Sequence, residues 1–417
     1  MRLPEKKLAF GLIAAALLSL LSLAPETILA ADFRLTPSLK VSEEYTDNVF
    51  ERNLNRKSDY ITRALPGLVM AYKAPLWDWD LGYNFDYRYY AKGSRKNDNT
   101  HEINAKGHLK IVDEVLFLDV SDVYKRVSLD VTRDTTHESL FVNQTDQNIG
   151  TVSPYLVLRP STRMTIKTGY RYINTWYKDP AAISKQDHVG FIDNSYEMSP
   201  KFFLTAGYTF TREDAANSIL YRHETYLGPR YEYADKSFIF AQGGAIVSVY
   251  DDIRGETVNP SWSAGITHTF DTMTANLSTS VKSSDDPRGV STLETAYSVS
   301  LVKNLQRGTV TLQGSYSEFS DAIANILKNK RYSGGFTSQF EILQDLRGTL
   351  GLTYEYYTDE RLAAYTRKYF VDSGLTWSVG KDISLGLSYR YIDYSSPKIV
   401  TDNYRVNRVI LEAKKSF

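Results

Sequence analysis

The sequence predicts an all-β protein: a transmembrane, up-and-down antiparallel β-barrel of about 20 strands, within a range of roughly 18–22. Three observations predict this fold. Apolar and polar side chains alternate with a period of two along most of the chain, which is typical of strands with two different faces. Short turns alternate with longer polar loops, as in a barrel whose strands run up and down. An export signal precedes the first strand.

About twenty segments show the alternation, each of roughly ten residues or more, close to the length that a tilted strand needs to cross a bilayer. In chain order they are 33–45, 60–73, 77–90, 101–111, 116–126, 148–158, 163–177, 188–198, 202–212, 224–233, 238–250, 260–270, 273–282, 292–302, 309–319, 331–342, 346–357, 368–379, 383–394 and 405–417. We expect short turns at 73–76, 112–114, 159–162, 199–201, 234–237, 271–272, 304–308, 343–345 and 380–382. Longer loops are expected between them, as at 46–59, 92–99, 127–146 and 283–290.

Proline falls inside five of these segments. Because proline cannot donate a hydrogen bond to a ladder and a closed barrel has no free edge, we expect bulges or strand ends at these positions. The five are Pro37, Pro66, Pro154, Pro229 and Pro260.

The segment 77–90, WDWDLGYNFDYRYY, indicates which solvent each face meets. One face carries seven large apolar or aromatic side chains, and the other carries Asp, Asn, Gly and Arg. A barrel can turn the first face to lipid and the second to an inner channel, since every backbone group is paired around a closed sheet. The charged residues that we expect to face the lumen are Asp78, Asp80, Asp86, Arg88, Lys167, Arg171, Arg230, Glu232, Glu355 and Arg390. Both signs occur together, which favours a hydrated channel for a neutral or mixed solute. Equally, such residues could serve only to solvate the wall and pair across strands.

Residues 1–30 have the layout of a cleaved secretory signal. Basic residues precede a continuous apolar run over 8–24, which ends at a proline and is followed by small residues. An anchor helix is the alternative, but the run is a little short of the ~20 residues that span a bilayer. We therefore expect residues 1–30 to be removed and residues 31–417 to form a barrel in the outer membrane of a Gram-negative bacterium. A TonB-dependent transporter is disfavoured, because strands begin almost at the expected mature N-terminus and leave no room for a plug.

Composition excludes several function classes. The 49 basic and 49 acidic residues give a net charge of zero, so there is no basic excess to bind nucleic acid. The absence of cysteine excludes disulfides and thiolate metal sites. Tyrosine is abundant, at 31 residues, as expected where amphipathic rings line the bilayer interfaces.

The chain shows no pattern typical of an enzyme. The loop that contains Asp134, His137 and Ser139 has the residue types of a catalytic triad, but triads are defined by geometry, and a solvated polar loop explains these residues better. No zinc-binding HExxH, P-loop or dinucleotide-binding motif occurs in a suitable context. We therefore expect no catalytic residues, no metal site and no cofactor.

The last segment ends in an alternating apolar face that closes on Phe417, with Lys415 as a polar exception. A terminal strand of this kind resembles the signal that outer-membrane barrels present to the barrel assembly machinery. The expected partners are therefore this machinery and outer-membrane lipid.

The opening of the mature chain resembles the beta-barrel porin-2 family, close to the outer-membrane barrels associated with PEP-CTERM/exosortase and exopolysaccharide loci. In that pattern a first strand ends in a YTDN element and the return strand carries an S-D…PGL element. The matching residues are Tyr45, Asp47, Asn48, Asp59, Pro66 and Gly67. The resemblance implies a porin-like barrel tied to exopolysaccharide export or biosynthesis, with polysaccharide or export proteins as partners. The alternatives are a general small-solute porin, and a structural or adhesive barrel with a blocked lumen.

Overall fold

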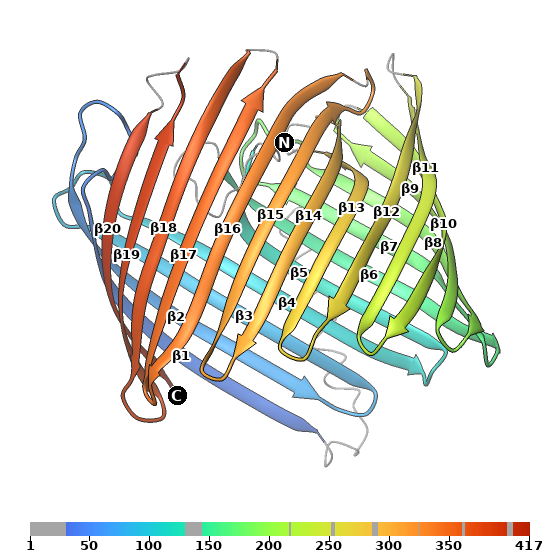
Figure 1. The fold of residues 1–417 in the computed structure, drawn as a ribbon, viewed down its shortest axis with the longest axis horizontal. Helices are drawn as coiled ribbons and strands as arrows, with labels where there is room; N and C mark the ends of the chain where they lie inside the picture. The colour runs from blue at the N-terminus through green and yellow to red at the C-terminus, as the bar shows by residue number, and fades with distance from the viewer. Residues whose placement is uncertain are drawn as a thin grey trace, which may run out of the picture.

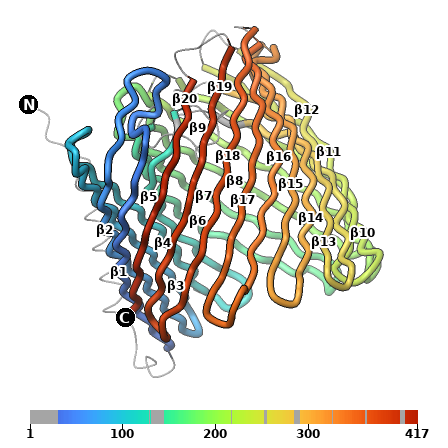
Figure 2. Tube along the Cα trace, turned by 60° about the vertical axis from the view of Figure 1, so that its left-hand side comes forward, coloured from blue at the N-terminus to red at the C-terminus, as the bar shows by residue number. Residues whose placement is uncertain are grey.

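The computed structural model describes residues 31–129, 144–216, 218–251, 255–285, 291–324, 326–360, 363–397 and 403–417. These residues form one sheet of twenty strands, and the sheet closes into a barrel because β1 pairs with both β2 and β20 (Figure 1 and Figure 2). All neighbouring strands are antiparallel. Apart from the closing pair, β1 and β20, they are also consecutive in the chain. The predicted all-β barrel and its strand number are confirmed. Among the described residues, no helix is long and apolar enough to span a membrane.

The strands are thirteen to eighteen residues long. In chain order they are β1 (Asp32–Thr46), β2 (Asp59–Lys73), β3 (Trp77–Tyr90), β4 (Asp98–Val112), β5 (Leu116–Ser128), β6 (Gln144–Ser161), β7 (Met164–Tyr177), β8 (Lys185–Ser199), β9 (Phe202–Ala215), β10 (Ser218–Ala234), β11 (Ser237–Tyr250), β12 (Glu256–Thr269), β13 (Met273–Asp285), β14 (Ser291–Leu305), β15 (Gly308–Asp321), β16 (Leu327–Leu343), β17 (Leu346–Asp359), β18 (Ala364–Ser378), β19 (Ile383–Ser395) and β20 (Tyr404–Ser416). The predicted signal segment 1–30 and the loop residues Asp134, His137 and Ser139 lie outside the described residues.

The two ends of the barrel differ in their connections. At the end where β1 begins and β20 finishes, all nine connections have two to four residues, at the predicted turn positions. We call this the turn end and the opposite one the loop end. At the loop end the β1–β2 connection has twelve residues, 47–58.

The expected strict alternation of short and long connections is wrong between β9 and β10. These strands run on to Ala215 and from Ser218, so that only two residues join them at the loop end. The sequence hides this extension because polar residues such as Asp214 and His223 occupy its outer face. A hairpin that projects beyond the bilayer needs paired backbone groups but no apolar face.

In the pairing register, residues that lie opposite each other on neighbouring strands share the inner or the outer face of the sheet. On β1, Ser42 and Glu44 are buried, while Leu39 and Val41, on the opposite face, are exposed. The same exposed face continues through Leu312 on β15, Leu387 on β19 and Leu411 on β20. A continuous exposed apolar surface of this kind is stable against lipid, not water.

The prolines do not produce the expected bulges. The β2–β3, β6–β7 and β10–β11 ladders each skip the pairs at Pro66, Pro154 and Pro229 and resume in the same register. Register shifts occur elsewhere, as at Phe319/Ser320. A proline removes one donor, and the neighbouring strand on its other side still holds it in place, so a local break in one ladder suffices.

Candidate functional site

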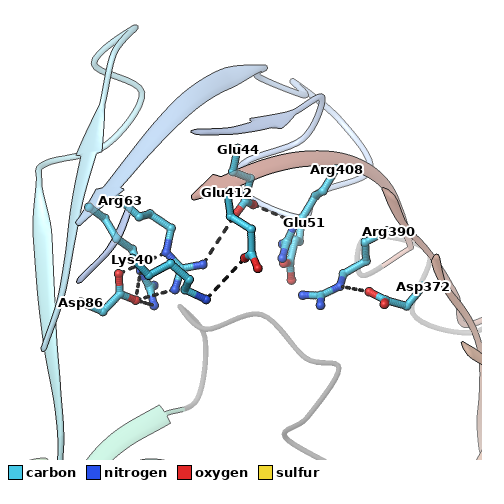
Figure 3. Close-up of polar contacts among 10 residues, drawn as sticks. Lys40, Glu44, Glu51, Arg63, Asp86, Asp372, Arg390, Arg408 and Glu412 are labelled. Carbon is cyan, nitrogen blue, oxygen red and sulfur yellow. Dashed lines mark hydrogen bonds and ion pairs between the residues drawn. The ribbon is translucent and has the colours of Figure 1, made fainter. Parts of the chain in front are cut away.

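The candidate site is the inner wall of the barrel. Figure 3 shows a group of charged side chains on the concave side of the strands. The pairing register places all ten residues that the sequence nominated on this same face of the closed sheet. They are Asp78, Asp80, Asp86, Arg88, Lys167, Arg171, Arg230, Glu232, Glu355 and Arg390. That these residues line a path for a solute stays a prediction.

Asp86 is the centre of the first charge group. Its carboxylate accepts hydrogen bonds from Arg63 Nε and Nη2 on β2, at 3.1 and 2.6 Å. It also accepts from Arg88 Nε and Nη2, two residues along β3, at 2.9 and 2.6 Å. Asp86 and Arg88 are both buried. Arg63 contacts both carboxylate oxygens, whereas both donors of Arg88 go to Oδ2, and these charge-assisted hydrogen bonds make one carboxylate between two guanidinium groups a stable arrangement.

A second group joins the first and last strands. Glu44 on β1 lies 3.7 Å from Arg63 Nη1 and 3.5 Å from Arg408 Nε on β20. Arg408 also forms an ion pair with Glu51 of the β1–β2 loop. Together with the first group they make a chain of alternating charges across β3, β2, β1 and β20 (Figure 3).

Two further ion pairs continue this face toward the turn end and β18. Lys40 Nζ lies 3.6 Å from Glu412 on the paired strands β1 and β20. Arg390 Nε donates to Asp372 Oδ2 at 3.1 Å across β18 and β19. In both pairs one charge is opposed by the other, so the wall is polar without a strong excess of either sign.

The remaining nominated residues lie apart from this group. Glu355 is 4.0 Å from Lys368, and Arg230 contacts Glu232 at 3.2 Å and stacks on Phe238 at 3.7 Å. Lys167 lies over Tyr155 and Arg171 over Phe191, at 4.0 and 5.2 Å from the ring centres. Asp78 and Asp80 sit near the turn end of β3, opposite His108 and Lys106 of β4.

The β1–β2 loop folds into the barrel. Val49 packs with Ile61 and Tyr90, which both lie on the inner face, and all three are buried. Asn48 is fully buried; its Nδ2 donates to the carbonyl oxygens of Arg52 and of Arg405 on β20. The loop therefore narrows the interior beside the charge group.

Among the residues that carry the family resemblance, Asp47, Asn48 and Asp59 lie at the two ends of this loop. Asp47 accepts from Asn407 of β20, and Asp59 accepts from the backbone nitrogens of Lys92 and Ser94 in the β3–β4 loop, at 2.8 and 3.2 Å. Tyr45 lies on the outer face, 5.2 Å from Tyr60. Gly67 lies on the inner face, where a side chain would meet Ser38 Oγ at 2.8 Å.

Sequence reasoning missed several members of the charge group. They are Lys40, Glu44, Glu51, Arg63, Asp372, Arg408 and Glu412. Six of the seven lie on strands, at positions that alternate with outward-facing residues. The period-two pattern could therefore have assigned them to the inner face. Glu51 lies in a loop, and no periodicity in the sequence indicates that it turns inward.

Among the described residues, no group of three His, Cys, Asp or Glu side chains could hold a metal ion. On the outer face, Nδ1 of His101, His188 and His223 lies 2.6–3.0 Å from a tyrosine hydroxyl on the neighbouring strand. On the inner face, His108 Nδ1 lies 2.7 Å from Asp119.

Solved structures resemble the chain over most of its length. The siderophore receptor PirA from Pseudomonas aeruginosa is 12% identical, with a TM-score of 0.52, over 92% of this chain and 80% of that one. The FrpB iron transporter from Neisseria meningitidis (F5-1 variant) is 9% identical, with a TM-score of 0.54, over 92% and 82%. A mutant of the ferric enterobactin receptor PfeA from Pseudomonas aeruginosa is 10% identical, with a TM-score of 0.53, over 93% and 81%. The fold is that of a Gram-negative outer-membrane barrel.

At this level of identity the likeness shows the fold alone. No protein-family model matches the sequence, and no curated protein matches it. The resemblance to the beta-barrel porin-2 family and its link to exopolysaccharide therefore remain proposals.

Proposed function

We propose that the protein is a non-enzymatic, porin-like outer-membrane barrel that serves exopolysaccharide export or biosynthesis. The observation that carries this proposal is the inner wall, where charges of both signs are held in ion pairs between neighbouring strands. Paired charges and hydroxyl groups offer many hydrogen bonds to a hydrated, uncharged polymer. They do not impose the strong ion selectivity that an unbalanced ring of charge would.

The link to polysaccharide is supported by the family resemblance over residues 36–72. The proposed partners are outer-membrane lipid around the apolar belt, the barrel assembly machinery at the strand that ends in Phe417, and polysaccharide or its export proteins. Phe417 is exposed on the outer face, and its backbone nitrogen donates to Pro37 O at 2.9 Å, so the terminal strand is closed into the barrel. Nucleic acid is not a proposed partner.

A structural or adhesive barrel with a blocked lumen is the second candidate. The inward fold of the β1–β2 loop favours it, because Val49 and Asn48 are buried inside the wall. A general small-solute porin is the third candidate, and it differs from the first only in the molecule that passes through the channel.

Two experiments separate these functions. In planar bilayers, the refolded protein should show stepwise conductance that neutral oligosaccharides block transiently. Folded protein that gives no conductance would exclude the channel and favour the structural role. In the native bacterium, deletion of the gene should reduce extracellular polysaccharide, whereas an unchanged amount together with normal conductance would favour the small-solute porin.

A further inference from the structure

The backbone hydrogen-bonded ladder between β12 and β13 is shorter than the two strands that it joins. β12 and β13 pair only between Ser263–Thr269 and Thr274–Ser280, next to their turn. Above this level β12 continues to Glu256 and β13 to Asp285, and no ladder pair joins these described segments. On their other sides both strands remain paired along these lengths, with β11 and with β14. We call the unpaired part the seam.

Side-chain packing, not backbone hydrogen bonding, closes the seam. The register with β14 and β15 puts Val281 and Leu293 on the outer face, yet both are buried in one cluster with Ile246, from the inner face of β11. An outer face can meet an inner face only if the ends of β13 and β14 lie inside the ends of β11 and β12. The two edges of the sheet therefore overlap at the seam.

Polar contacts hold the overlap at two points. Asn259, on the inner face of β12, donates through Nδ2 to the carbonyl oxygen of Ala322 in the β15–β16 connection, at 3.0 Å. Ala322 is buried and belongs to the same apolar cluster. At the lower end of the seam, Trp262 Nε1 donates to Thr279 Oγ1 on β13 at 3.2 Å. These contacts can break without disturbing any ladder.

The seam begins at the level of the bilayer's outer half, where the β12–β13 ladder stops. A strand tilted by ~45° rises roughly 2.3 Å per residue along the membrane normal, so Trp262, seven residues above Thr269, lies roughly 16 Å above the turn end. The apolar band is about 25 Å high. Outside the seam, Val258 is 66% and Leu277 57% exposed, while the inner face of β12 carries Thr257, Asn259 and Ser261.

We propose that the seam between β12 and β13 is a lateral gate through which an amphipathic molecule with acyl chains moves between the barrel interior and the outer leaflet. Such a molecule is the class that fits both sides: its polar part meets the hydroxyl and amide groups of β12, and its chains meet the apolar belt. A wholly polar solute gains nothing from leaving sideways into lipid. Free strand edges are normally avoided at membrane depth, so an edge kept closed only by side-chain packing and side-chain hydrogen bonds is consistent with a wall that opens. The inference needs the barrel to lie in a membrane, but it does not need an open axial channel.

The chain has no cysteine, so a disulfide lock can be placed cleanly. We would introduce Asn259→Cys with Ala322→Cys to fix the overlap, and a photoreactive benzophenone amino acid at Ser261, on the inner face beside the seam. The protein is reconstituted in liposomes of phosphatidylethanolamine and phosphatidylglycerol, irradiated, and analysed for covalently attached phospholipid. The matched control carries the probe at Ser388, on the inner face of β19, within continuous ladders to β18 and β20.

Capture of phospholipid at Ser261 in the reduced protein is expected to exceed capture at Ser388 by at least about tenfold. Oxidation of the disulfide should abolish most of it, and reduction should restore it. A second pair, Ser278→Cys with Ser298→Cys, locks directly opposed residues of the intact β13–β14 ladder and should leave capture unchanged.

Equal capture at Ser261 and Ser388, or capture at Ser261 that survives the lock, would overturn the gate. If the disulfide does not form, spin labels at Asn259 and Ala322 replace it. Two distance populations in liposomes would support the gate, and a single short distance would overturn it. Because none of these readouts measures conductance, the gate and the proposed channel can fail separately.

Discussion

Asp47, the first residue after β1, accepts two hydrogen bonds from Asn407 of β20: one from the backbone nitrogen at 2.8 Å and one from Nδ2 at 2.7 Å. The two residues are 360 positions apart in the chain, and their contact joins β1 to β20 at the loop end of the barrel. This pair links the motif that carries the family resemblance to the closure of the whole barrel.

Replacement of Asp47 by alanine should weaken that closure. Loss of two hydrogen bonds to a carboxylate, in a partly buried site, should lower the free energy of unfolding by about 2–3 kcal/mol. Urea unfolding in detergent micelles, followed by the shift in gel mobility between folded and boiled protein, measures the change. Asp32→Ala, at the exposed turn end of the same strand, is the control and should be close to neutral.

Replacement of Glu51 by alanine should release the β1–β2 loop from the inner wall. Without the ion pair to Arg408, the loop opens more often, and trypsin should cut at Arg52, Arg56 or Lys57 about tenfold faster, in proportion to the open population. Limited proteolysis of the reconstituted barrel with mass spectrometry identifies the cuts. Glu114→Ala, in an exposed turn, should leave the rate at these sites unchanged. A resistant loop in the Glu51 variant would show that Asn48 and Val49 hold it without the ion pair.

Replacement of Asp86 by asparagine should leave Arg63 and Arg88 facing each other without their shared carboxylate. Removal of one member of a buried charge group should lower the free energy of unfolding by up to about 3 kcal/mol. If the barrel conducts, the uncompensated positive charge should shift the reversal potential in a salt gradient toward anion selectivity. Asp80→Asn, on the same face of the same strand but more exposed, should give a smaller change in both quantities.

Adjacent substitutions on β19 test which face meets lipid. Leu387 is exposed on the outer face, and Ser388 lies on the inner face. Leu387→Arg should cost about 2–4 kcal/mol of folding free energy in a bilayer, because an arginine near the middle of the apolar belt must be taken out of water. Ser388→Arg should cost much less, since its side chain stays in the hydrated interior. Refolding into lipid vesicles over a urea series measures both, and equal costs would contradict the assigned faces.

The fold class, the approximate strand number and the nine tight turns follow from the amino-acid sequence alone. Alternation with a period of two is a local property of each strand, and a strand that meets lipid on one side and water on the other records both solvents in its own residues. For the same reason, the nominated charged residues could be assigned to one face of their strands before any partner was known.

Which of these residues come together depends on the tertiary structure. The pairing of Arg63 with Asp86, of Glu44 with Arg408 and of Glu51 with Arg408 depends on register and on closure between the first and last strands. The inward fold of the β1–β2 loop and the overlap of β13 inside β12 arise in the same way. Each is a contact between two strands, or between a loop and the wall, that depends on how these parts are placed against one another, and a repeating pattern along one strand contains no information about that placement.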